Sequence, residues 1–360
     1  MNIVKEITDC FNNEALKAGM RRVQGKMAHD AELCDLANQL NHLLYDEDNA
    51  EGFLALLGGN AGMLSYKLEG DAGCFIMCVF DSSFNRLLDI YERRGIPQTV
   101  LLETLSEFDV SADEYYVEHG KVGVSDSSWI LNHMQGKLFK LGRLQFIVNK
   151  KFAYNSYVFR NSTGETLVVA KDGVCVDAEG FVTRGEPAFT TNFIKTDTTV
   201  TANRIDKKGN ILATTIEILL NEYQCVLEPG DDALNVHIPS GSKLDIYLCQ
   251  KSLDDAIAFG RKHFPEYNYK AFTLRSWLLS EEVKELLDNN ANIIRFSDMF
   301  SRAAGIRTSS RQQVYNWIFG HGSSIDDYLN HEAKTTLQRG AHRLLDEDKW
   351  FITRTGFIII

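Results

Sequence analysis

The most informative stretch of the chain is residues 234–264, LNVHIPSGSKLDIYLCQKSLDDAIAFGRKHF. It begins as a predicted strand, LNVHIP, and ends as a predicted helix in SLDDAIAFGRKHF, with a Ser/Gly loop between the two. In sheets covered by helices, ligands usually sit beyond the carboxyl ends of central strands, where loops and helix starts present free backbone N–H groups. The loop after Val236 is therefore the first candidate for a binding site.

The last third of the chain continues this alternation. KAFTLRSWLL, NIIRFSDMF and WFITRTGFIII read as strands, whereas SEEVKELLD and a long stretch from RQQVYNWIFG through Leu345 read as helices. Upstream, short segments rich in β-branched and aromatic residues predict a meander of strands from about Gly142, followed by a hairpin of VTANRID and ILATTIEIL. This pattern predicts a mixed sheet flanked by helices.

The first 120 residues have a helical pattern instead. Residues 31–45 place leucines three and four positions apart, which indicates one apolar stripe along a helix, and residues 75–93 and 99–108 predict two further helices. The pattern changes after them. We therefore expect an α+β fold, with a helical N-terminal domain over residues 1–118 and an α/β domain over residues 119–360.

Composition narrows the possible partners. Lys and Arg total 38 against 49 for Asp and Glu, a formal net charge of -11, which argues against nonspecific binding to nucleic acid or anionic membranes. No run of about 20 apolar residues is present to cross a bilayer. The first residues, MNIVKEITDC, lack the apolar run of a signal peptide, so we expect a cytoplasmic protein. The sequence leaves the oligomeric state open.

The seven cysteines are odd in number and scattered, without a CxxC pair or a Cys/His cluster. Cys74 and Cys78 lie one helical turn apart, but no second pair completes a tetrahedral zinc site. We expect buried thiols and no metal site.

The loop itself can receive a phosphate or diphosphate group. Gly241 permits backbone conformations closed to other residues, the serines supply hydroxyl groups, and Lys243 supplies a positive charge. Short Ser/Gly loops also often do no more than turn the chain. The Walker pattern GxxxxGK[ST] is missing, which excludes an ordinary nucleoside triphosphatase. The candidate binding segment comprises Ile238, Ser240, Gly241, Ser242 and Lys243.

His237 lies in the predicted strand beside this loop. An imidazole has an ordinary pKa of about 6.5, so it is suited to act as general base for an amine or hydroxyl nucleophile. A hydrogen-bonded structural histidine is the alternative. No GxSxG elbow, HExxH helix or Ser/His/Asp order supports a covalent hydrolase or zinc protease.

Two further segments mix polar and aromatic residues and are candidates for lining a substrate pocket. Strand alternation sends Arg143 and Gln145 to one face, close in sequence to Trp129. Arg275 and Trp277 repeat the mixture on a later strand. A solvated strand face and an ordinary core tryptophan are the alternatives.

Several motifs resemble a little-characterised bacterial family of predicted acyltransferases: LFKLGRLQF (residues 138–146), NVHIPSG (235–241), SLDDAIAFGRKHFPE (252–266), SWLLS (276–280) and NIIRF (292–296). Members of that family pair an N-terminal helical domain with a GNAT-like C-terminal domain. The resemblance implies a central mixed sheet in which the diphosphate of acetyl-CoA or another acyl-CoA lies at the loop formed by residues 238–243.

On this basis the leading hypothesis is direct acyl transfer from acyl-CoA to an amine or hydroxyl of a small-molecule acceptor, with His237 as base. Tyr247 or Tyr328 would protonate the leaving thiolate.

A noncatalytic binding or assembly protein with a GNAT-like sheet stays open, because the loop has one glycine where the usual GNAT signature has two. A splayed pair of central strands would favour the enzyme. A sugar or peptidoglycan-related binding module is a third reading, suggested by the aromatic residues Trp129, Tyr154, Tyr157, Trp277 and Trp317.

Overall fold

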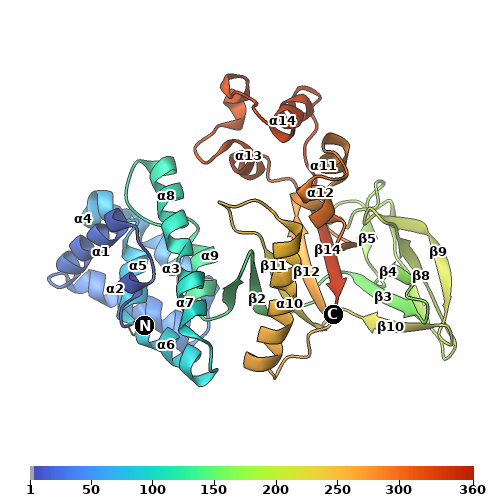
Figure 1. Cartoon of the computed structure of the whole chain (residues 1–360), viewed down its shortest axis with the longest axis horizontal. Coiled ribbons are helices and arrows are strands. Elements are labelled where there is room, and N and C mark those ends of the chain that lie inside the picture. Colours follow the sequence, from blue (N-terminus) through green and yellow to red (C-terminus); the bar gives the residue numbers. More distant parts are fainter. Residues whose placement is uncertain (1–3) are drawn as a thin grey trace. The chain divides into compact units, whose positions relative to one another are not determined.

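The computed structural model describes residues 4–360, so Met1, Asn2 and Ile3 of the segment that was tested for a signal peptide lie outside it. The chain forms two compact units, Met1–Leu141 with Gln145–Ile147 and Gly142–Leu144 with Val148–Ile360 (Figure 1). The units thus divide near residue 142, whereas the change of sequence pattern placed the domain boundary at residue 118. Two elements account for the difference, because α8 (Glu107–His119) and α9 (Ser127–Met134) both lie in the first unit.

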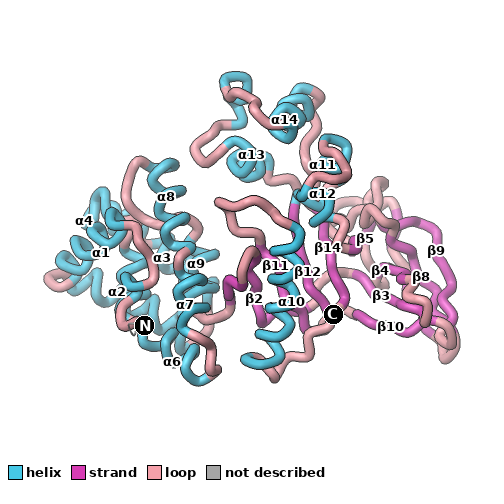
Figure 2. The backbone as a smooth tube through the Cα atoms, in the orientation of Figure 1, coloured by secondary structure: helices cyan, strands magenta, loops and turns pink. Residues whose placement is uncertain are grey.

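The first unit is helical, as the sequence predicts (Figure 2). Its core contains large phenylalanine side chains that are fully buried, among them Phe53, Phe75, Phe80 and Phe108. Three short turns accompany the α-helices. One is the π-helical turn His42–Asp46, and the other two are the 3-10 turns Ile7–Asp9 and Glu69–Asp71. The remaining helices are α1 (Glu14–Met27), α2 (Ala31–Asn41), α3 (Ala50–Gly59), α4 (Ala61–Leu68), α5 (Phe75–Ser82), α6 (Phe84–Arg93) and α7 (Gln98–Leu105).

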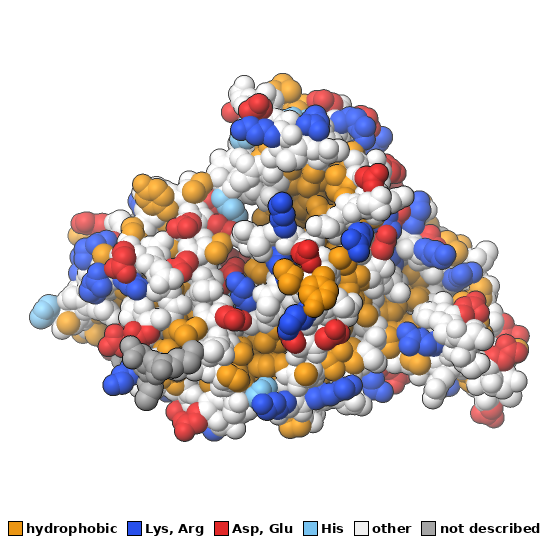
Figure 3. All heavy atoms as spheres, viewed as in Figure 1, with side chains coloured by type: hydrophobic (Ala, Val, Ile, Leu, Met, Phe, Trp, Pro, Cys, Tyr) orange, Lys and Arg blue, Asp and Glu red, His pale blue; other side chains and the backbone are white. Residues whose placement is uncertain are grey.

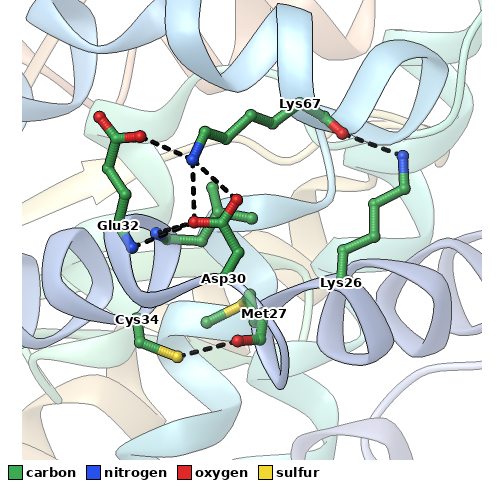
Figure 4. A network of polar contacts seen from close by, with 7 residues as sticks. Lys26, Met27, Asp30, Glu32, Cys34 and Lys67 are labelled. Carbon is green, nitrogen blue, oxygen red and sulfur yellow. Dashed lines mark hydrogen bonds and ion pairs between the residues drawn. The ribbon is translucent and has the colours of Figure 1, made fainter.

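Asp30 shows how this unit specifies a helix start. Its carboxylate accepts hydrogen bonds from the first-turn amides of Glu32 and Leu33, which would otherwise lack partners. The Lys67 ammonium lies between the carboxylates of Asp30 and Glu32, at 2.7 and 2.6 Å (Figure 4). The ion pairs therefore join α4 to the start of α2.

The single helix predicted over residues 75–93 is two helices in the structure. Ser83 separates them, with φ −121° and ψ 11°, and its hydroxyl donates to the side-chain oxygen of Asn41 at 2.8 Å. A serine hydroxyl that finds partners of this kind offers the chain an alternative to a continuous helix. The helix predicted over residues 99–108 is also divided, since α7 ends at Leu105 and α8 begins at Glu107.

The central sheet has the strand order β1-β2-β11-β12-β14-β13. β11 and β12 run parallel, whereas β14 is antiparallel to both β12 and β13, so the sheet is mixed, as predicted. α10 (Ile246–His263) connects β11 to β12 and lies across one face of these strands (Figure 1). The strands are β1 (Leu138–Leu141), β2 (Leu144–Lys151), β11 (Asp232–His237), β12 (Ala271–Ser276), β13 (Ser301–Ala303) and β14 (Arg354–Ile359).

A second sheet follows β2 in sequence, in the order β10-β3-β4-β8-β7 with β9 paired to β8. The predicted hairpin is present as β8 and β9, whose register pairs Thr199 with Leu219. Phe152 and Leu227 belong to a hydrophobic cluster that connects this sheet with the central one. The strands are β3 (Ser156–Asn161), β4 (Thr166–Ala170), β7 (Phe193–Lys195), β8 (Thr199–Ile205), β9 (Ile211–Leu219) and β10 (Tyr223–Leu227), beside the small pair β5 (Cys175–Val176) and β6 (Phe189–Thr190).

The prediction of a strand over NIIRFSDMF was wrong. Residues Asn292–Ser297 form the helix α12, and a strand begins only at Ser301. Ile294 and Phe296 are both buried, and Ile293 also packs against a core cluster, so tertiary burial on several sides overrides the β-propensity of a short apolar run. The other C-terminal helices are α11 (Glu281–Leu286), α13 (Arg311–Phe319) and α14 (Thr336–Asp346), with the 3-10 turns η4 (Trp277–Leu279) and η5 (Ile325–Asn330).

Acidic and basic side chains are interspersed on the face of the molecule that Figure 3 shows. In the part of the chain that the structure describes, no helix combines the length and the apolar character needed to cross a bilayer.

Candidate functional site

The two parallel central strands part at Asn235. Their register pairs Ala233 with Ala271, Leu234 with Phe272 and Asn235 with Thr273, and within the described residues the pairing ends there. β11 nevertheless continues to His237 and β12 to Ser276. Backbone groups beyond the last pair are thus no longer shared between these two strands.

A chain of polar side chains lies at this point of divergence. The Asn235 amide donates from Nδ2 to the Thr273 carbonyl oxygen and to its Oγ1, both at 3.1 Å. Its Oδ1 lies 2.6 Å from Nε2 of His237, two residues further along the same strand face. Tyr154 lies close to the Thr273 side chain, and burial raises the pKa of Tyr154 to about 12. The imidazole is therefore held by a network that reaches across both strands.

The loop after His237 is exposed between two buried anchors. Ser240, Gly241 and Ser242 are exposed, whereas Pro239 and Leu244 are buried. Gly241 has φ +89°, a backbone conformation that other residues adopt only with strain. The loop thus has fixed ends and an accessible middle.

Arg143 fixes the conformation of this loop from within. Its guanidinium donates to three loop carbonyl oxygens: Nε to Lys243 at 2.9 Å, Nη1 to Pro239 at 3.0 Å and Nη2 to Ser242 at 2.8 Å. The side chain is 9% exposed, and burial lowers the pKa of the guanidinium from its ordinary value. An arginine keeps its charge even so, since its ordinary pKa is above 12.

The backbone of Arg143 is anchored as well. Its amide donates to Oγ of Ser252 at 2.8 Å, and that hydroxyl donates to the Leu248 carbonyl. The residue therefore ties the loop to the first turns of α10.

Arg143 contacts the carbonyl groups of the loop and not its backbone amides. Within the second unit, none of the described residues accepts a hydrogen bond from the backbone N–H groups of Ser240, Gly241, Ser242 or Lys243. The loop leads directly into α10, whose cap is Asp245, accepting from the Leu248 amide at 3.0 Å. Exposed amides, a lysine and a helix N-terminus together form a setting that suits an anion.

Other predicted site residues lie elsewhere. Trp129 and Gln145 belong to the first unit, where Gln145 is buried and donates to Oε2 of Glu107 at 3.2 Å. Burial raises the pKa of the Glu107 carboxyl group. Gln145 thus contacts a buried carboxyl group of the first unit, and Arg143 contacts the loop of the second.

The two tyrosines differ in their surroundings. Tyr247 lies on the first turn of α10 and is 73% exposed. Tyr328 lies in η5, packs against the cluster formed by α13 and α14, and donates its hydroxyl to the carboxylate of Asp346, which raises the pKa of Tyr328. Of the two, Tyr247 is the one that adjoins the loop in sequence.

Arg275 is exposed and donates to Oγ1 of Thr308 at 2.7 Å. Trp277 is a core residue, 7% exposed, with its ring centroid 5.2 Å from that of Phe351. The sequence did not single out Asn235 or Thr273. The signal that could have found Asn235 is its position two residues before His237, on the same face of the strand.

Trp277→Leu should therefore act on stability rather than on ligand binding. Loss of part of a buried aromatic contact is expected to lower the free energy of unfolding by about 2 kcal/mol. Urea titration followed by circular dichroism measures this change. A variant of unaltered stability that binds its substrate less tightly would instead place Trp277 in the substrate pocket.

Comparisons with known proteins agree with this fold. The model of the GNAT-like C-terminal domain matches residues 138–358, and the model of the N-acyltransferase N-terminal domain matches residues 13–136. No curated protein matches the sequence.

Several solved structures are similar. An acyltransferase in complex with CoA and 10C-teicoplanin is 17% identical, with a TM-score of 0.59 over 97% of this chain and 88% of that one. An acyltransferase in complex with decanoyl-CoA is 18% identical, with a TM-score of 0.55 over 81% of this chain and 68% of that one. A complex with decanoyl-CoA and teicoplanin gives 20% and 0.53 over the same shares. At such identities the likeness concerns the fold.

Proposed function

The chain belongs to the acyltransferase family that combines an N-acyltransferase N-terminal domain with a GNAT-like C-terminal domain, and we propose that it transfers an acyl group from acyl-CoA to an amine of a small-molecule acceptor. The observation that carries the proposal is the loop after β11, whose carbonyl groups are taken up by Arg143 while its amides stay available. The acyl-CoA complexes of the similar acyltransferases support the same donor.

The diphosphate of CoA is the group that this loop fits. The amides of Ser240 to Lys243 would donate to its oxygens, and the Lys243 ammonium would add favourable charge. Gly241 has no side chain to obstruct the approach, and an added Cβ there would meet nothing within 4 Å. The separation of β11 and β12 beyond Asn235 supports a place for the pantetheine arm between the strands.

The chemistry follows from the thioester. The amine nitrogen of the acceptor attacks the carbonyl carbon, a C–N bond forms, and the C–S bond breaks to release the CoA thiolate. His237 takes the proton that the amine loses. Tyr247 gives a proton to the thiolate and regains it from solvent, since the Tyr328 hydroxyl is already bonded to Asp346. An amine acceptor agrees with the name of the N-terminal family model, and a hydroxyl acceptor would follow the same steps.

Calorimetric titration with acetyl-CoA, longer acyl-CoAs and desulfo-CoA tests the donor. We expect saturable heat with a stoichiometry near one per chain, and mass spectrometry of protein purified without added ligand should detect retained CoA species. Absence of heat with every thioester and with desulfo-CoA would contradict the proposal.

Gly241→Ala should weaken CoA binding more than it weakens the fold. A non-glycine residue at positive φ is strained by about 1–2 kcal/mol, so the loop should leave its native conformation and the dissociation constant of CoA should rise about tenfold. Gly230→Ala is the matched control, since Gly230 has φ +102° and equally open surroundings, but lies in the turn before β11. Thermal unfolding should report a similar loss for both variants. Equal CoA affinities in the two would remove the loop from the binding site.

The second candidate, a noncatalytic binding protein, rests on the single glycine of the loop. It would bind CoA in the same titrations and give no acyl transfer to a panel of primary amines and alcohols. Release of free CoA thiol in the presence of an acceptor distinguishes the two functions.

A further inference from the structure

We propose that Asn235 is the positioning residue of this site: it holds His237 in the tautomer that carries its proton on Nε2, which makes Nδ1 the basic nitrogen. The part that Nδ1 plays in acyl transfer rests on the proposed function. The tautomer itself is a property of the folded chain and can be measured without any substrate.

The hydrogen-bond partners of the Asn235 amide determine its orientation. Its two ends are chemically distinct, since Nδ2 only donates and Oδ1 only accepts. One end faces the Thr273 carbonyl oxygen, which can only accept, so that end must be Nδ2. The opposite end, which faces His237, is therefore Oδ1.

The tautomer follows from that orientation. Oδ1 accepts, so the His237 nitrogen 2.6 Å away must be the donor, and that nitrogen is Nε2. A neutral imidazole has one N–H, which leaves the lone pair on Nδ1. The backbone of β12 thus selects the basic nitrogen of a histidine on β11 through one asparagine side chain.

The surroundings keep Asn235 in this position. Thr273 is its direct neighbour in the parallel register and is 3% exposed, and its Oγ1 accepts a second hydrogen bond from Nδ2. Tyr154 lies close to the same Thr273 side chain, and Arg275 acts on Tyr154 electrostatically from the next position on that strand face. Both Nδ2 hydrogens can therefore be used, whereas an inverted amide would set Oδ1 against the Thr273 carbonyl oxygen and lose that hydrogen bond.

A neutral partner also matters for a base. A carboxylate beside an imidazole favours the protonated ring and raises the imidazole pKa by about 1–3 units. An amide orients the ring and adds no charge of its own.

The direct test is the nitrogen-15 spectrum of the imidazole in protein labelled at histidine, with His237→Gln to assign the signal. We expect the wild-type ring to carry its proton on Nε2 above pH 7. Asn235→Leu, which removes the hydrogen bond at similar volume, should give a mixture of both tautomers. A wild-type ring protonated on Nδ1 would overturn the proposal, as would a tautomer unchanged in Asn235→Leu.

Kinetics connect the tautomer with the reaction. Asn235→Leu should lower kcat about tenfold or more with little change in KM for acyl-CoA, since a base loses part of its population to the wrong tautomer. In Asn235→Asp, the rising limb of the pH profile of kcat/KM should instead shift to higher pH by about 1 unit or more. The added carboxylate keeps the ring protonated, so activity returns only at a pH where the ring loses its proton. An unmoved limb in Asn235→Asp would contradict the assigned contact.

Asn203→Leu is the control for loss of a buried asparagine. Asn203 also bonds backbone carbonyls from a strand, those of Leu212 and Ala213, but it lies in the second sheet. Its replacement should lower stability and leave the imidazole signal of His237 unchanged. If His237→Ala proves fully active while the wild-type ring is protonated on Nε2, the assignment of His237 as general base fails and the tautomer set by Asn235 stands.

Discussion

His237→Ala should lower kcat by about 10²–10⁴-fold, the range typical for loss of a positioned general base. The dissociation constant of CoA should stay within about twofold, because His237 lies on the strand before the loop and the diphosphate would be held by the loop amides. Steady-state release of CoA thiol and calorimetry on the same preparations measure the two quantities.

Tyr247→Phe gives the comparison for this variant. It should lower kcat less than His237→Ala does, because a thiolate leaves readily without help and solvent can protonate it. Full turnover by His237→Ala would eliminate the histidine as the base. A large rise in the CoA dissociation constant with unchanged kcat would assign it to binding instead.

Arg143→Met should be the most damaging change for acyl-CoA binding. It keeps a long apolar side chain but leaves the carbonyls of Pro239, Ser242 and Lys243 without the guanidinium that orders them. Hydrogen bonds to a charged group contribute about 1.5–3 kcal/mol each, and a loss of only one such bond corresponds to about tenfold in affinity. We expect the CoA dissociation constant to rise at least tenfold.

Two further variants separate loop order from general stability. Arg143→Lys keeps the charge but cannot donate to three carbonyls in one plane, so it should restore only part of the affinity. Arg302→Met removes another buried arginine that donates to carbonyls, those of Ser297 and Phe300, and should lower stability without weakening CoA binding. Equal loss of CoA affinity in Arg143→Met and Arg302→Met would reduce the role of Arg143 to folding.

The strand, loop and helix of residues 234–264 could be predicted because their chemistry is local. β-branched and apolar residues alternate up to His237, a Ser/Gly turn follows, and apolar residues then recur at helical spacing. The short apolar run of α12 offered no such distinction, since a few buried isoleucine and phenylalanine residues suit a strand and a buried helix equally. Its fold was decided by neighbours that the local pattern does not contain.

The sequence predicts the loop as a candidate site, but the contacts that hold the loop could not be predicted from it. Gly241 and Lys243 mark the loop in the sequence, but Arg143 reaches Lys243 across 100 positions of the chain. Strand alternation predicts the face of the strand on which Arg143 lies, but not the groups that its side chain contacts. The role of Asn235 could not be predicted from the sequence, because it depends on the register between β11 and β12, which no single segment specifies.

A crystal structure of the chain with desulfo-CoA or another non-reactive acyl-CoA analogue would test the central idea most directly. We expect diphosphate oxygens within hydrogen-bonding distance of the backbone amides of residues 240–243. The Arg143 guanidinium should still donate to the loop carbonyl oxygens. A diphosphate bound elsewhere, with those amides turned away from it, would contradict the account.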